Sequence, residues 1–151
     1  LPFIYGVHHW ETTSVNTSGN THTTQTQHHR EEVLEFHPQF RFIPFRLSWD
    51  QGRGEEFEWE SFNRRFDVHS SDPRFSSDVI HPRQMEYLMR SPGYPFEYTP
   101  RGTIKVSMPT ISIGTITVAQ DFLQGFFSRV PLFVWRRLGM SDRPPGLDDL
   151  S

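Results

Sequence analysis

Histidines near the N-terminus are the first residues that invite chemistry. They form two adjacent pairs around a polar stretch: His8, His9, His28 and His29. If the two segments pair as strands, His8 and His9 lie roughly across from residues 25–28, and Glu31 or Glu32 adds a carboxylate. Zinc and other borderline metals accept such ligands. Adjacent residues of a strand point to opposite faces, however, so solvated or cross-strand histidines on a polar hairpin are the favoured interpretation. No metal ligand and no cofactor is assigned.

The run from His69 to Asp72 contains the residue types of a hydrolase triad. Triad members converge from separate segments, so four consecutive residues favour a polar turn instead. In that turn Asp72 binds local backbone amides ahead of Pro73. Asn63 stands between two large aromatic residues and is expected to be a buried amide bonded to a strand edge. No catalytic residue is assigned.

Charged residues offer two further possibilities. The acidic run at positions 55–60 lacks the spacing of a calcium loop and is expected to be a solvated sheet face. Several arginines could line an anion site at the start of a helix beginning at Pro82, although pairing with nearby carboxylates is favoured. They are Arg64, Arg65, Arg74, Arg83 and Arg90. Phosphate-loop, dinucleotide, metalloprotease and nucleophile-elbow signatures are absent.

Composition bounds the classes of function. The 151 residues are enough for one domain with a real core, and 14 of them are Phe. The chain has no cysteine, which excludes disulfides, thiolate catalysis and Cys-ligated zinc. A formal net charge of −3 and a pI near 6.2 argue against nucleic acid as a partner. No apolar run is long enough to cross a membrane.

The elements that must position these residues begin with a hairpin. Apolar residues alternate over positions 2–10, which predicts a half-buried strand. Positions 12–26 are polar with a turn signal at 16–20, and strand character resumes over 28–37. This pattern predicts a long β-hairpin with a mobile polar tip.

The middle of the chain alternates between strand and helix patterns. Pro44 predicts an edge strand or a bulge within positions 40–49. Positions 55–68 alternate again, and positions 69–73 end that strand. Ser77 or Asp78 is expected to cap a following turn, and Pro82 suits the first position of a helix that ends at 91–95.

The C-terminal part predicts a hairpin and a long helix. Positions 96–108 are expected to turn at 100–102, and Ile111 and Ile113 extend that sheet. Apolar residues repeat every four positions in a helix over 117–138, which Pro131 breaks or restarts. Gly139 suits the position after that helix. Positions 140–151 are a disordered tail by composition.

A set of residues at fixed spacing resembles a family of uncharacterised bacterial membrane-associated proteins. The shared positions are Phe62, Asn63, Phe66, Asp72, Pro73, Ser77, Val79, Ile80, His81, Pro82 and Met85, with the closing run 122–138. Within that family the chain most resembles the actinobacterial branch of the group called domain of unknown function 3137. The resemblance implies one or two transmembrane helices before a soluble, cytoplasmic part, and it implies no established activity. A start at Leu1, inside a predicted strand, agrees with a missing N-terminal anchor.

The sequence therefore predicts an α+β domain over residues 1–139. It consists of an antiparallel sheet of roughly five to seven strands with two helices packed on one face. The expected core is Phe36, Phe57, Trp59, Phe62, Phe66, Val68, Ile80, Met85, Leu88, Ile104, Val106, Phe122, Phe126, Val130 and Trp135.

The expected function is that of a non-enzymatic binding or scaffolding module that meets a protein partner at the membrane. One alternative is a metal- or small-ligand-binding, enzyme-like domain that uses the hairpin histidines. Another is self-association through an exposed edge near positions 40–49.

Overall fold

The computed structural model describes residues 3–18, 21–91 and 93–151, and it describes side chains from residue 33 onward. Six strands of the described residues form one sheet, in the order β1-β2-β6-β5-β3-β4, and each pair of neighbouring strands is antiparallel. The predicted α+β class and strand number are confirmed. The strands are β1 Phe3–Ser18, β2 Thr21–Phe36, β3 Phe45–Trp49, β4 Phe66–Ser70, β5 Phe96–Tyr98 and β6 Ile104–Met108.

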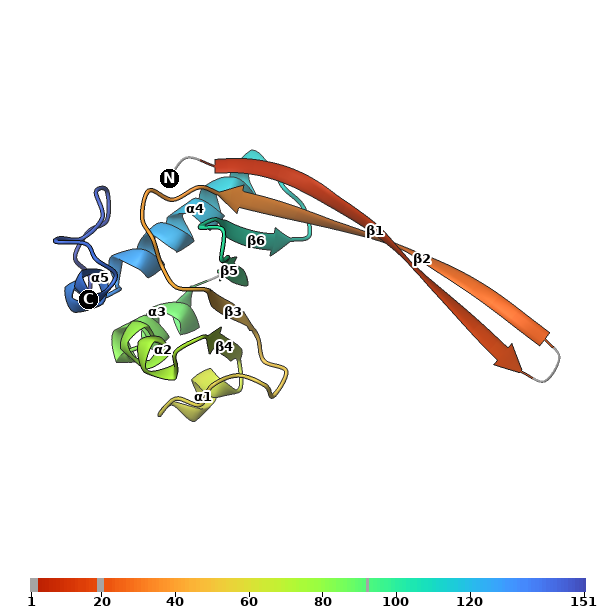
Figure 1. Ribbon diagram of the computed structural model, residues 1–151, viewed down its shortest axis with the longest axis horizontal. Helices are drawn as coiled ribbons and strands as arrows, with labels where there is room; N and C mark the ends of the chain where they lie inside the picture. Colours follow the sequence, from red (N-terminus) through yellow and green to blue (C-terminus); the bar gives the residue numbers. More distant parts are fainter. Residues whose placement is uncertain (1–2, 19–20, 92) are drawn as a thin grey trace.

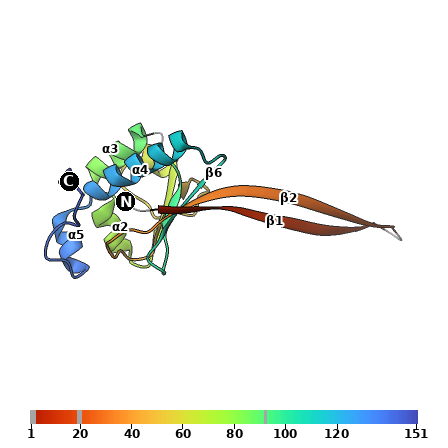
Figure 2. The ribbon, with the colours of Figure 1, turned by 90° about the horizontal axis from the view of Figure 1, so that it is seen from above.

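Helices cover one face of the sheet, and α3 and α4 lie side by side there (Figures 1 and 2). Among the described residues no helix is long and apolar enough to cross a membrane. The two predicted helices are present, as α3 and as α4 followed by α5, and the described residues add two short helices, α1 and α2, that the sequence did not predict. The bounds of these helices are α1 Glu60–Asn63, α2 Pro73–Val79, α3 Pro82–Arg90, α4 Ile113–Ser128 and α5 Leu132–Arg137.

The first two strands form the predicted long hairpin, which projects far beyond the domain (Figure 1). Its strands run well into the polar segment 12–26, further than the apolar alternation indicated. Residues 19–20, inside the predicted turn, lie outside the described part of the chain. Only Glu32 to Phe36 of β2 pair with β6, so the hairpin joins the sheet at its base.

Strand β3 corrects the expectation of an edge near positions 40–49. It pairs with β4 on one side and β5 on the other, so it is an interior strand. Pro44 does not interrupt a ladder because it immediately precedes the strand. The edge strands of the sheet are β1 and β4, so β3 does not supply the exposed edge that was expected near positions 40–49.

The strand predicted over 55–68 is wrong in its first half. Residues 55–59 are irregular, α1 follows, and only β4 has the extended form. The Asn63 amide explains part of this shape, because its Oδ1 accepts from Phe57 N at 2.9 Å and its Nδ2 donates to Phe57 O at 2.7 Å. The predicted bond from the amide to the backbone exists, but Asn63 is only half-buried and holds a loop rather than a strand edge.

Two caps set the helices that follow. The sequence interpretation missed α2, whose N-cap Asp72 accepts a bond from Arg74 N at 3.0 Å. Helix α3 begins at Pro82 as predicted. Its cap is His81, whose ring accepts from Gln84 N at 3.4 Å, and neither Ser77 nor Asp78 has that role.

The C-terminal elements follow the prediction with one correction. Strands β5 and β6 turn through Gly102, which has a φ of 82°. Ile111 and Ile113 do not extend the sheet, since Ser112 forms a capping box with Thr115 and α4 begins at Ile113. A new helix, α5, starts after Pro131, and Gly139 follows it with a φ of 90°.

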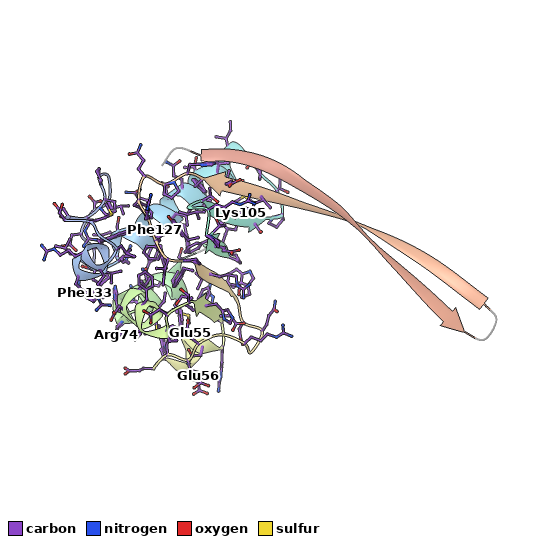
Figure 3. All side chains as sticks on the ribbon, in the orientation of Figure 1. Glu55, Glu56, Arg74, Lys105, Phe127 and Phe133 are labelled. Atoms are coloured by element: carbon purple, nitrogen blue, oxygen red, sulfur yellow. The ribbon has the colours of Figure 1, made fainter. Side chains whose placement is uncertain are left out.

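The core is dominated by aromatic rings. Phe127 lies at its centre, 4.9 Å from Phe40 and 5.3 Å from Phe42 between ring centroids, whereas Phe133 sits at the periphery (Figure 3). The predicted core residues are buried, with two exceptions. Phe57 is only partly buried, and Trp59 is 39% exposed.

Residues 140–151, for which composition predicts a disordered tail, lie against the end of α4 in the structure. Arg143 donates to the carbonyl oxygens of Ser128 and Val130, at 3.2 and 2.6 Å. Leu150 N donates to Ser128 O at 3.0 Å. This packing brings the last residues of the chain beside α3, where Arg83 donates to Ser151 O at 3.0 Å.

Candidate functional site

The hairpin histidines occupy register positions that differ from those expected. His8 pairs with Glu31 and His9 with Arg30, rather than with residues 25–28. His28 pairs with Glu11 and His29 with Trp10. The side chains of residues 1–32 lie outside the described part, so metal binding by these histidines stays a prediction.

The polar run after β4 has a local structural role. Besides the cap that Asp72 forms, Ser70 Oγ donates to Asp72 O at 2.7 Å and lies 2.5 Å from Ser76 Oγ. His69 stands opposite Arg46 in the register of β4 and β3. The predicted bonding of Asp72 to local backbone is confirmed, and the hydroxyl of Ser70 is engaged at the start of α2.

The acidic run at 55–60 does not form the expected solvated strand face. The two carboxylate oxygens of Glu55 are shielded from solvent without a hydrogen-bond partner, while Glu56 and Glu58 are exposed. Within the residues whose side chains are described, no group of three or more His, Asp or Glu residues could hold a metal ion.

The five arginines considered for an anion site do not converge at the start of α3. Arg64 pairs with Glu60 at 2.5 Å, and Arg65 donates to Met89 O at 2.8 Å. Arg74 is exposed on α2 (Figure 3). Arg83 and Arg90 do line one pocket, but they lie along the side of α3, and the third arginine there is Arg129.

The outer face of α3 carries four residues at helical spacing: Arg83, Glu86, Tyr87 and Arg90. The Tyr87 hydroxyl donates to Phe122 O at 2.9 Å and so joins α3 to α4. Burial raises the pKa of Tyr87, against the opposing positive charge of Arg129. The Arg129 guanidinium lies 3.9 Å above the Tyr87 ring.

One side of this face forms what we term the tryptophan groove, with a volume of about 520 Å³. Trp59 stands at the groove with 39% of its surface exposed, and Met85 and Met89 contribute apolar surface. The alternation over 55–60 assigned Trp59 to the core, but that strand does not form. The lining residues are Glu58, Trp59, Pro82, Met85, Glu86, Met89 and Arg90.

The other side forms the arginine pocket, with a volume of about 310 Å³. It combines residues of α3 with Arg129, just after α4, and Leu150 from the last residues of the chain. Sequence reasoning missed Arg129 and Leu150, because only the packing of α3, α4 and the final segment brings them to α3. The lining residues are Arg83, Glu86, Tyr87, Arg90, Arg129 and Leu150.

Comparisons with known proteins supply no relative for these sites. No family model, no curated protein and no solved structure matches the chain.

Proposed function

We propose that this chain is a non-enzymatic binding module that docks a segment of a protein partner in the tryptophan groove. The observation that carries the proposal is the exposed indole of Trp59 beside Met85 and Met89. Tryptophan, methionine and arginine are enriched at protein interfaces, and tryptophan is frequent among the residues that dominate binding energy.

The chemistry of the groove indicates what kind of segment binds. Met89 is only partly buried, and its flexible, polarizable thioether adapts to different apolar shapes, whereas Met85 is 5% exposed and contributes little surface. Glu58 and Glu86 lie at the same groove, together with Arg90. An apolar anchor side chain flanked by a basic residue fits this lining, with the apolar group against Trp59 and the basic group near Glu58.

The cellular setting of the proposal rests on the resemblance to uncharacterised membrane-associated bacterial proteins. By that resemblance the module is held at the membrane by a preceding helix, on its cytoplasmic side. The partner is then a protein at the same membrane.

A random peptide library displayed on phage tests the groove directly. We expect selected peptides to share an apolar anchor and to bind Trp59→Ala at least about tenfold more weakly, equivalent to ~1.4 kcal/mol. Trp49→Ala is the matched control, because Trp49 is 47% exposed but lies on β3. Peptides that bind wild type and Trp59→Ala equally, or that fail to enrich, contradict the docking site.

The proposal that the module is not an enzyme is tested separately. Assays of the wild-type chain against ester, phosphate and peptide substrates are expected to give no turnover. Turnover that a single substitution in this chain abolishes would overturn it.

A second candidate function uses the hairpin histidines to bind a metal. Register pairs His8 with Glu31 and His28 with Glu11, so residues of metal-binding type are paired at two positions. We expect stoichiometric metal in protein purified without a histidine tag, and its loss in the double variant His8→Ala, His28→Ala. Metal-free protein whose melting is unchanged by a chelator removes this candidate.

A further inference from the structure

The arginine pocket shares Glu86 and Arg90 with the tryptophan groove, but its other lining residues take no part in the docking proposal. Three parts of the chain meet there: the outer face of α3, the residue after α4, and the last residues. The hydroxyl bond of Tyr87 to Phe122 O fixes α3 against α4 at this point. The pocket is thus a product of tertiary packing and not of one helix.

Two of its guanidinium groups are held in place by contacts that leave most donors free. Arg129 donates from Nη1 to Gly125 O at 2.9 Å while lying over the Tyr87 ring. Arg83 donates from Nη1 to Ser151 O at 3.0 Å. A guanidinium has five N–H donors, so each of the two keeps several for a ligand.

The third guanidinium has a weak partner. Arg90 Nη2 lies 2.7 Å from Glu86 Oε1, but both side chains are more than half exposed. Exposed ion pairs of this kind contribute little, so Arg90 can turn to a stronger anion at small cost. Three arginine charges against one carboxylate leave the lining side chains with a net charge of +2.

We propose that the arginine pocket binds a phosphate monoester dianion. A dianion matches the net charge, and its oxygens accept paired N–H groups from guanidinium forks. The Tyr87 ring and Leu150 offer apolar contact to the esterified group. The ester belongs either to a small phosphorylated metabolite or to a phosphorylated side chain of a protein, since both present the same group.

Titration calorimetry with phenyl phosphate at pH 7.5 tests the site. We expect saturable 1:1 binding, with affinity reduced about tenfold in Arg83→Gln and in Arg90→Gln, as fits loss of a charged hydrogen bond. Phenyl sulfate, a monoanion of similar shape, should bind more weakly. Arg136→Gln is the matched control, because Arg136 is an exposed helical arginine of α5 outside the pocket.

Unsaturable binding, equal affinity for phenyl sulfate, or an equal loss in Arg136→Gln would overturn the proposal. Wild-type melting temperatures for the variants show that a loss of binding is not unfolding. The source is separated by a phosphoserine peptide and its free phosphoserine counterpart. Tighter binding of the peptide supports a protein source, and equal binding supports a metabolite. Arg83→Gln separates this proposal from the docking proposal, because Arg83 lines the arginine pocket and not the tryptophan groove, and Trp59→Ala should leave phosphate binding unchanged.

Discussion

At the scale of single residues, buried polar groups organise the loops around the sheet. Asp67 on β4 is only 4% exposed and accepts a hydrogen bond from Gln51 N at 2.9 Å. Burial raises its pKa, but bonds with the backbone of Gln51, Arg53 and Gly54 and the side chain of Asp50 lower the pKa by more. Asp67 therefore holds the 50–54 loop while it is ionised.

The variant Asp67→Asn tests this role through its pH dependence. Because the pKa is lowered from its ordinary value of 3.8, the ionised carboxylate stabilises the folded chain at any pH above 3.8. This contribution is lost as the pH falls through the pKa of the folded chain. Asp67→Asn should therefore lower the free energy of unfolding at pH 7, and the gap from wild type should narrow below pH 3.8.

Urea unfolding at pH 7 and pH 3 measures this gap. Asp148→Asn, at an exposed aspartate near the C-terminus, is the control and should show almost no gap at either pH. A gap for Asp67→Asn that stays constant with pH would contradict the assigned role.

Gly125 gives a second prediction at this scale, based on close packing. A Cβ at this position of α4 would lie 2.7 Å from Cζ of Tyr87, whose hydroxyl bonds to Phe122 O. We expect Gly125→Ala to lower the free energy of unfolding by about 1–3 kcal/mol, despite the helix preference of alanine.

The matched variant lies in the same helix. A Cβ at Gly114 would meet only Ser112 Oγ, at 3.8 Å, so Gly114→Ala should be stabilising by up to ~1 kcal/mol. Chemical denaturation of both variants measures the contrast. The same sign of change for both would show that Tyr87 does not restrict α4.

At the scale of elements, the uncovered face of the sheet carries charges of alternating sign. Strand register places Glu35 opposite Lys105, Lys105 opposite Glu97, and Glu97 opposite Arg46. Opposite charges on neighbouring strands each contribute roughly 0.2–1 kcal/mol. Lys105 on β6 is exposed and stands between Glu35 and Glu97 in this row.

Reversing the central charge tests the row. Lys105→Glu places a carboxylate between Glu35 and Glu97, so we expect a loss of about 1 kcal/mol, clearly larger than for Lys105→Gln. The excess should shrink in 1 M salt, where the Debye length is about 3 Å. Equal losses for the two variants would indicate that the row makes no electrostatic contribution.

At the scale of the whole molecule, a compact domain carries the projecting hairpin of β1 and β2, which we term the ribbon (Figure 2). Only at its base, over Glu32 to Phe36 of β2, does the ribbon pair with β6, and elsewhere β1 and β2 pair with each other. The outer part of the ribbon projects away from the helices and the other strands (Figures 1 and 2).

Shortening the ribbon tests this division. In the shortened variant, residues 11–28 are replaced by Asn-Gly. Trp10 and His29 are already paired in the register, and Asn-Gly supplies a two-residue hairpin turn between them. The free energy of unfolding should change by less than ~1 kcal/mol, because surface changes away from the core have small effects. A much larger loss in thermal melting would show that the ribbon supports the domain.

Local patterns in the sequence were sufficient for several elements. The hairpin, the helix beginning at Pro82 and the break at Pro131 follow from alternation, helical spacing and the backbone limits of proline. Most of the core follows for the same reason, since spacing decides which face of an element is apolar. The strand predicted from the alternation at 55–60 is wrong, because the Asn63 amide and the turn of α1 hold that segment as a loop.

The sequence by itself therefore determined the class of fold, most element types and the residues that avoid water, because these depend on neighbours along the chain. Only the tertiary structure decided that β3 is interior, that Trp59 lies at a groove, and that Arg129 joins Arg83. Those outcomes depend on contacts between segments far apart in the chain. No local period encodes such contacts, and the packing of all elements together selects them.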